Sequence, residues 1–347
     1  MKKNNAIIPP ICVSTIFAME APFTDKEFQY SRIGNPTRKT LETTLAHLED
    51  AKFCSVFSSG SSAIATFLLS LHQGDTVLCH TVMYEGTQRL FQKLFNQFGI
   101  HVQTVDMKNM PLVKTMMKSN VQWIFFESPT NPLLEVLDIQ SICRLAHQQH
   151  IQVAVDNTLA SPVVQKPLAL GADVVIESLS KAINGHSDVI GGLIATNDKT
   201  LHKKLQFLQQ TMGAILSPID CFLILRGLKT IHIRVAAQQK TAREIFTFLS
   251  KHANVRDLHF PNSGSVLSFR LKQSMNPNSF LKRLQTITIA QSFGGIETVI
   301  QQPTRMMHLS LTKEEQKKVS IDDRFFRLSI GLENAQDIIH DLTQALV

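Results

Sequence analysis

The chain has 347 residues, of which 44% are hydrophobic and 18% charged, which is enough for two domains and excludes a peptide-like or disordered protein. The formal net charge is +7, but the sequence contains no dense block of Lys and Arg with interleaved aromatics. We therefore expect a solvated basic surface or a preference for anionic small molecules, and no nucleic-acid partner.

The cysteines and the N-terminal sequence indicate the cellular compartment of the protein. The five cysteines are Cys12, Cys54, Cys79, Cys143 and Cys221. They are scattered and include no CxxC pair, which predicts reduced thiols in a cytoplasmic protein, with neither a disulfide framework nor a metal site. In residues 1–17, Pro9 and Pro10 interrupt the apolar stretch too early for a signal sequence, so we expect no export and no membrane span.

Helix-like segments alternate with short apolar runs from about residue 41 onward. These runs lie at 75–80, 121–128, 151–158 and 172–180. Strands separated by helices predict parallel βαβ units, and runs that are apolar throughout predict a sheet covered by helices on both faces. Functional groups are then expected at the carboxyl ends of these strands.

The pattern changes after Gly227, where a long helical segment leads to further strand-like runs at 265–271 and 325–332. The sequence contains no internal repeat. We expect a short N-terminal arm over residues 1–29, a large domain over 30–228 and a smaller C-terminal α/β domain over 229–347.

Lys181 follows the last apolar run of the large domain, beside Ser178 and Ser180 and before a glycine-bearing loop. A lysine in this position can reach an interior cofactor, although a lone lysine after a strand is most often a solvated surface residue. Asp156 ends the preceding run, and a carboxylate there can keep the pyridine nitrogen of pyridoxal 5'-phosphate (PLP) protonated. The alternative for Asp156 is that it caps the following turn.

The segment 58–69 places Gly60 and Ser61 at the start of a helix-like pattern. Free backbone N–H groups and the helix dipole form an anion site there, so the segment is a candidate phosphate cradle or an ordinary helix cap. Tyr84 follows the run at 75–80 and can stack on a flat cofactor ring, or it is a surface-loop tyrosine.

Eight motifs occur in a characteristic order. They are YSRIGNPT (30–37), FSSGSSAI (57–64), ESPTNP (127–132), VDNT (155–158), SLSKAINGHSD (178–188), LRGLKT (225–230), SFGGIET (292–298) and RLSIGLE (327–333). Together they resemble the Cys/Met-metabolism PLP enzymes, which include cystathionine γ-synthase, cystathionine β- and γ-lyases, methionine γ-lyase and the homoserine sulfhydrylases. The resemblance implies a fold-type I PLP-dependent transferase with a mostly parallel central sheet, assembled as a homodimer or homotetramer with shared active sites.

The resemblance also implies a role for individual residues. Lys181 would hold PLP as a Schiff base and move the α-proton of an amino-acid substrate, and Tyr84 would stack on the cofactor and assist proton transfer. Own-subunit cofactor contacts would come from Gly60, Ser61, Asp156, Ser178 and Ser180, and contacts to the neighbouring subunit's phosphate from Tyr30 and Arg32. Substrate contacts would come from Arg327 to the α-carboxylate, and from Asn131, Ser292 and Arg89. Without the resemblance, Arg327 at a strand start would be taken for a surface charge.

The exact reaction stays open at this point. The leading hypothesis is a lyase that cleaves a C–S bond of cystathionine in the β or γ direction, and the nearest alternative is γ-replacement on an activated homoserine. Gln29 and Gln291 occupy positions that are acidic in cystathionine γ-lyases and several synthases, which leaves the subfamily unassigned. An alternative of another class is a family member that binds PLP without catalysis. The short segment before residue 30 makes the dimer a firmer expectation than the tetramer.

Overall fold

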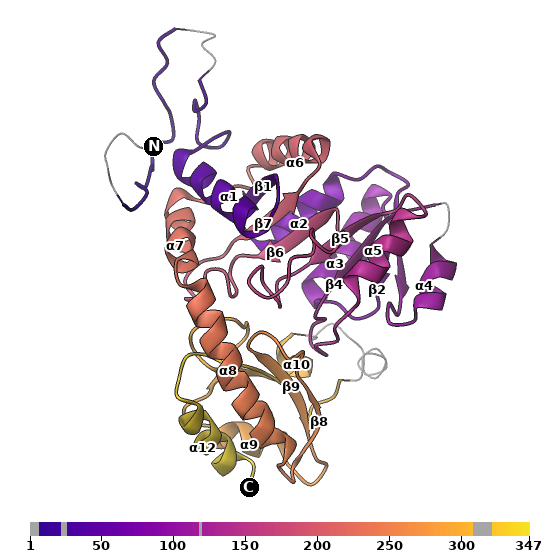
Figure 1. The fold of residues 1–347 in the computed structure, drawn as a ribbon, viewed down its shortest axis with the longest axis vertical. Helices are drawn as coiled ribbons and strands as arrows, with labels where there is room; N and C mark the ends of the chain where they lie inside the picture. Colours follow the sequence, from indigo (N-terminus) through magenta and orange to yellow (C-terminus); the bar gives the residue numbers. More distant parts are fainter. Residues whose placement is uncertain (1–6, 22–25, 118–119, 308–320) are drawn as a thin grey trace.

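A computed structural model describes residues 7–21, 26–117, 120–307 and 321–347. Two sheets lie at different levels of the molecule, and a long helix runs from one to the other (Figure 1). Within the described residues, every helix is too short or too polar to cross a bilayer.

The larger sheet has seven strands in the order β1-β7-β6-β5-β4-β2-β3. They are β1 (Phe53–Phe57), β2 (Thr76–His80), β3 (His101–Val105), β4 (Val121–Glu127), β5 (Gln152–Asp156), β6 (Val174–Ser178) and β7 (Gly192–Thr196). The strands from β6 to β3 pair in parallel, and β7 runs antiparallel to both of its neighbours. The predicted α/β fold with a mostly parallel sheet is confirmed, and the strands at 75–80, 121–128, 151–158 and 172–180 correspond to β2, β4, β5 and β6.

Helices cover this sheet on both faces. They are α1 (Pro36–Leu48), α2 (Gly60–Leu69), α3 (Glu85–Arg89), the π-helix η1 (Leu90–Leu94), the 3-10 helix η2 (Phe95–Phe98), α4 (Met110–Met116), α5 (Ile139–His147), α6 (Lys199–Met212) and α7 (Pro218–Leu228). Successive residues of β5 show the two-sided burial, because Ala154 packs with one hydrophobic cluster and Val153 and Val155 with another. This explains why the strands are apolar throughout.

Local sequence sets the start of the helix nearest the candidate phosphate cradle. Ser59 caps α2, with its hydroxyl accepting a hydrogen bond from Ser62 N at 2.9 Å. β7 packs closely behind this turn, because a Cβ at Gly192 would lie 2.3 Å from Ser59 O. The glycine therefore allows the strand to approach the first turn of α2.

The C-terminal part is built on the second sheet, in the order β10-β11-β12-β9-β8. Its elements are α8 (Ile231–Ser250), β8 (Val255–His259), β9 (Val266–Leu271), α9 (Pro277–Arg283), β10 (Thr288–Ile289), β11 (Val299–Gln301), α10 (Pro303–Met306), β12 (Phe325–Ser329) and α12 (Ala335–Ala345). The long helix α8 descends from the larger sheet and packs on this sheet together with α9 and α12 (Figure 1). The long helix after Gly227 and the strands near 265–271 and 325–332 are confirmed, although β12 ends at Ser329. The domain boundaries at 29 and 228 stay a prediction.

The described residues before α1, 7–21 and 26–35, form an arm that extends from the body of the molecule (Figure 1). Its apolar side chains are largely exposed, for example Ile7, Val13 and Ile16 at 95%, 67% and 70%. A β-bridge between Ile16 and Tyr30 closes the segment at its base. An arm of this kind has an apolar surface that the described part of the chain leaves exposed.

Candidate active site

Lys181 lies three residues beyond the end of β6, and its side chain turns toward the C-terminal part of the chain. Its Nζ donates a hydrogen bond to Ser292 Oγ at 2.6 Å and lies 5.1 Å from the centre of the Phe293 ring. Gly294 permits this approach, because a Cβ there would lie 2.7 Å from Ala182 N. Ser292 itself has a φ of 100°, a conformation disfavoured for a residue with a Cβ. The structure thus brings together two predicted site residues that are 111 residues apart in the chain.

The surroundings of the Lys181 amine lower its pKa. Burial lowers its pKa from 10.5 to about 8, and the positive charge of Arg327 contributes to the same direction. A lower pKa gives more of the neutral amine near pH 7, which is the form that attacks a carbonyl or accepts a proton.

We expect the attachment of PLP to the apoprotein to follow this titration. The rate should rise with pH and level off above a midpoint near pH 8, because only the neutral amine reacts. Replacing Arg327 with Met removes a neighbouring positive charge and should move the midpoint upward. The measurement is the rate, as a function of pH, at which PLP becomes attached to the protein in a form that borohydride fixes covalently. A midpoint near 10.5 in the wild type would show that the environment leaves the amine unperturbed.

Asp156 ends β5, the strand next to β6, so its carboxylate and the Lys181 segment emerge at the same edge of the sheet. Its Oδ1 accepts a hydrogen bond from Thr158 N at 2.9 Å, so the turn-capping bond considered from the sequence is present. Burial raises the pKa of Asp156, which favours a partner that brings a positive charge or a proton. A protonated pyridine nitrogen meets that requirement.

The segment predicted as a phosphate cradle or a helix cap forms the N-terminus of α2. Gly60 packs on β6, since a Cβ at Gly60 would lie 3.1 Å from Ser178 Cβ. Ser61 follows in the first turn of α2, where backbone N–H groups point outward. The Ser180 hydroxyl accepts a hydrogen bond from Gly191 N at 3.0 Å. Amine, carboxylate and helix N-terminus therefore form a set that fits PLP, and the role of each residue remains a proposal.

Arg327 is the largest of the fully buried side chains in the described structure, at 2% exposure. Its guanidinium donates to Asn131 Oδ1 at 2.7 Å, to Ser292 O at 3.0 Å and to Gln301 Oε1. It also lies over the Phe293 ring, 4.9 Å from the ring centre. Burial lowers the pKa of Arg327 to about 10, so the group stays charged near neutral pH. The interpretation of Arg327 as a surface charge at a strand start is wrong, because it lies inside β12 and faces the interior.

Tyr84 precedes α3 and is 40% exposed. Its backbone N–H donates to Glu127 Oε1 at 2.7 Å. The ring lies against Gly86, where a Cβ would be 2.4 Å from Tyr84 Cε1, so glycine is required for this ring position. Arg89, the last residue of α3, is exposed, and its predicted substrate contact stays a prediction.

Tyr30 and Arg32 lie where the segment before α1 meets α6. The Arg32 guanidinium lies 5.5 Å from the centre of the Tyr30 ring and donates to Gln210 O on α6 at 2.7 Å. Both side chains are exposed at the base of the projecting arm. Their position is compatible with the predicted contact to a neighbouring subunit, which stays a prediction.

Three residues near the site were not singled out from the sequence. Gln301 is the register partner of Arg327 on β11, and Phe293 lies under both cationic groups. Glu127 is buried at the end of β4, directly beside Asp156 in the parallel ladder. For Glu127 a signal was available, because an acidic residue ends an otherwise apolar run.

Fold and site together define a PLP-dependent enzyme, in which an amine, a carboxylate and a helix N-terminus meet at the carboxyl edge of a parallel sheet. The chain belongs to the Cys/Met metabolism PLP-dependent enzyme family, which matches residues 1–347. The resemblance stated from the motifs is therefore confirmed. The cofactor of this protein is PLP, and its substrate is an amino acid.

Individual relatives show the same likeness over nearly the whole chain. The cystathionine gamma-lyase of Dictyostelium discoideum is 39% identical, over 99% of this chain and 94% of the relative. The structure is similar to cystathionine gamma-lyase from Lactobacillus plantarum complexed with L-serine, with a TM-score of 0.94, 36% identity, and coverage of 97% of this chain and 92% of that one. It is also similar to cystathionine gamma synthase from Xanthomonas oryzae pv. oryzae in complex with cystathionine, with a TM-score of 0.96, 34% identity, and coverage of 100% and 94%.

Proposed function

We propose that this protein is a cystathionine lyase that cleaves the γ C–S bond. The products would be cysteine, 2-oxobutyrate and ammonia, with one water consumed. The observation that carries the proposal is that Lys181 and Arg327 both contact Ser292. The Lys181 amine donates a hydrogen bond to the Ser292 hydroxyl, and the Arg327 guanidinium donates one to the Ser292 carbonyl oxygen. A proton-transferring amine and a carboxylate-binding cation at fixed separation suit an α-amino acid. The cystathionine gamma-lyases among its relatives support the choice of substrate.

In this proposal each residue has a defined task. When bound, PLP supplies an electron sink for the charge that develops at the substrate Cα. Lys181 would hold the cofactor and would move the Cα proton, and its lowered pKa favours the neutral amine that this task needs. Arg327 pairs with the α-carboxylate and so fixes which Cα bond is broken. Asp156 would keep the proton on the cofactor's pyridine nitrogen, while Gly60, Ser61, Ser178 and Ser180 would hold its phosphate.

Tyr84 would stack on the cofactor ring and assist proton transfer at the leaving sulfur. The proposal includes a homodimer or homotetramer in which Tyr30 and Arg32 reach the phosphate of the neighbouring subunit. The exposed apolar arm before residue 30 supports such an assembly, because a second copy would cover it. The five free cysteines support a reducing, cytoplasmic location.

A second candidate is γ-replacement, in which cysteine displaces the acyl group of an activated homoserine to form cystathionine. The similarity to a cystathionine-bound synthase favours it. Two neutral amides bear on the choice: Gln29 is exposed near the arm, and Gln291 donates to Met306 O at 2.6 Å. An amide there offers no negative charge to the distal amino group of cystathionine.

The test is to incubate the purified protein with cystathionine and, separately, with O-acetyl- or O-succinylhomoserine plus cysteine. We expect cysteine and 2-oxobutyrate from the first mixture. Homocysteine and pyruvate would instead identify cleavage in the β direction. Formation of cystathionine in the second mixture, without cleavage of cystathionine in the first, would establish γ-replacement. If the PLP-loaded protein turned over neither mixture, the result would favour a non-catalytic PLP-binding protein.

A further inference from the structure

Glu127 is a buried carboxyl group that the proposed chemistry does not use. It is the last residue of β4 and 4% exposed. Its register partner on β5 is Asp156, so two acidic residues lie side by side at the active-site edge of the sheet. Burial raises the pKa of Glu127 well above its usual range, the nearby Asp156 adds to the rise, and Arg327 opposes it. A carboxyl group in this position costs stability unless it is well satisfied.

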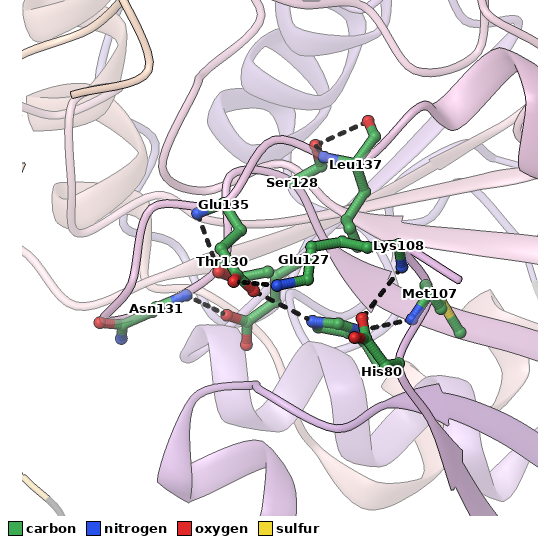
Figure 2. Close-up of polar contacts among 10 residues, drawn as sticks. His80, Met107, Lys108, Glu127, Ser128, Thr130, Asn131, Glu135 and Leu137 are labelled. Atoms are coloured by element: carbon green, nitrogen blue, oxygen red, sulfur yellow. Dashed lines mark hydrogen bonds and ion pairs between the residues drawn. The ribbon is translucent and has the colours of Figure 1, made fainter. Parts of the chain in front are cut away.

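The two oxygens of Glu127 bind two different segments. Oε1 accepts a hydrogen bond from the backbone N–H of Tyr84 at 2.7 Å, and Oε2 accepts one from the backbone N–H of Asn131 at 3.2 Å. Figure 2 shows the contact with Asn131 at the start of the loop that follows β4. A single side chain thus joins the segment after β2 to the loop after β4.

Each of these segments carries a group that the proposed reaction needs. Tyr84 supplies the ring that would lie on the cofactor. The Asn131 side chain accepts a hydrogen bond from Arg327 Nη1 at 2.7 Å, and so orients the proposed carboxylate-binding group. The other end of the same loop is held separately, by Glu135, which pairs with Lys108 and lies 3.6 Å from His80 Nε2 (Figure 2).

A carboxyl group can accept both hydrogen bonds at this position, from Tyr84 N and from Asn131 N, whereas a glutamine cannot. Two backbone N–H donors need two acceptor oxygens, and a glutamine has one acceptor and one NH2 group. A glutamine would therefore place two donors against each other at Tyr84 or at Asn131, and leave a buried N–H unsatisfied.

We infer that Glu127 is a positioning residue that sets the Tyr84 ring and the Asn131–Arg327 pair in one geometry. It therefore links cofactor orientation to recognition of the substrate carboxylate. This inference rests on the proposed function, because Tyr84 and Arg327 take their roles from it.

The test compares Glu127→Gln and Glu127→Asp with the wild type. For Glu127→Gln we expect a KM for the amino-acid substrate about tenfold higher, together with weakened circular dichroism of the bound cofactor, because both dependent groups lose their alignment. Glu127→Asp keeps two acceptor oxygens and should recover part of both properties. If Glu127→Gln fails to fold, Glu127→Asp alone tests the inference. Its shorter side chain should still raise KM and weaken the dichroism signal relative to the wild type.

A matched control is available in Asp341→Asn. Asp341 is also a buried carboxylate that accepts backbone N–H groups, from Gln285, Thr286 and Ile287, but it lies on α12. We expect this variant to lose thermal stability while its KM and cofactor dichroism stay unchanged. Wild-type values in both folded Glu127 variants, or equal changes in Asp341→Asn, would overturn the inference. A wild type that takes up no PLP would instead refute the proposed function.

Discussion

Lys181→Ala is expected to give a folded protein that shows no Schiff-base absorption band after PLP is added and the unbound excess is removed, and whose kcat falls by about 10³-fold or more. The variant loses both the covalent attachment of the cofactor and the base for the Cα proton, and general acid–base catalysis alone contributes about 10²- to 10⁴-fold. The measurement combines the visible absorption spectrum, before and after borohydride, with the rate of oxo-acid release. The wild type should show a yellow band that borohydride abolishes.

The control for this variant is Lys251→Ala, which removes an exposed lysine just beyond α8. It should keep the wild-type spectrum and rate. Cofactor that stayed covalently attached to Lys181→Ala after borohydride reduction and denaturation would mean that another lysine holds it.

Arg327→Lys should lower kcat/KM by about 10²- to 10³-fold, mainly through KM, while the cofactor band remains. Truncating one partner of a buried charge pair costs about 2–5 kcal/mol, and a lysine cannot reproduce the two parallel hydrogen bonds of a guanidinium to a carboxylate. It would also lose the simultaneous contacts to Asn131, Ser292 and Gln301. The measurement is a steady-state titration with the amino-acid substrate, followed by inhibition with an analogue that lacks the carboxylate. That analogue should bind the variant and the wild type equally.

Arg270→Lys provides the comparison within the same sheet. Arg270 lies on β9, the neighbour of β12, and its guanidinium contacts Asp257 and Asp322 at the surface. Its replacement should leave KM unchanged. An unchanged KM in Arg327→Lys would show that the substrate carboxylate is bound elsewhere.

Much of the larger sheet was predictable because its determinants are local. Apolar runs of strand length bounded by polar turns identify β2, β4, β5 and β6, and a Ser-Gly turn identifies the start of α2. The antiparallel strand β7 was not foreseen, since strand direction depends on how the chain returns to the sheet. The boundaries of β12 were also less accurate, because backbone pairing decides where a strand ends.

The sequence by itself determined the family and the choice of Lys181 and Asp156 as candidate cofactor residues, because the eight ordered motifs and the end of each apolar run are local features of the chain. Only the tertiary structure decided the place of Arg327, whose partners Asn131, Ser292 and Gln301 are 196, 35 and 26 residues away along the chain. Only the structure revealed the double contact of Glu127. The physical reason is that burial and hydrogen-bond partners across two sheets depend on how the sheets pack, and local sequence does not encode these distances.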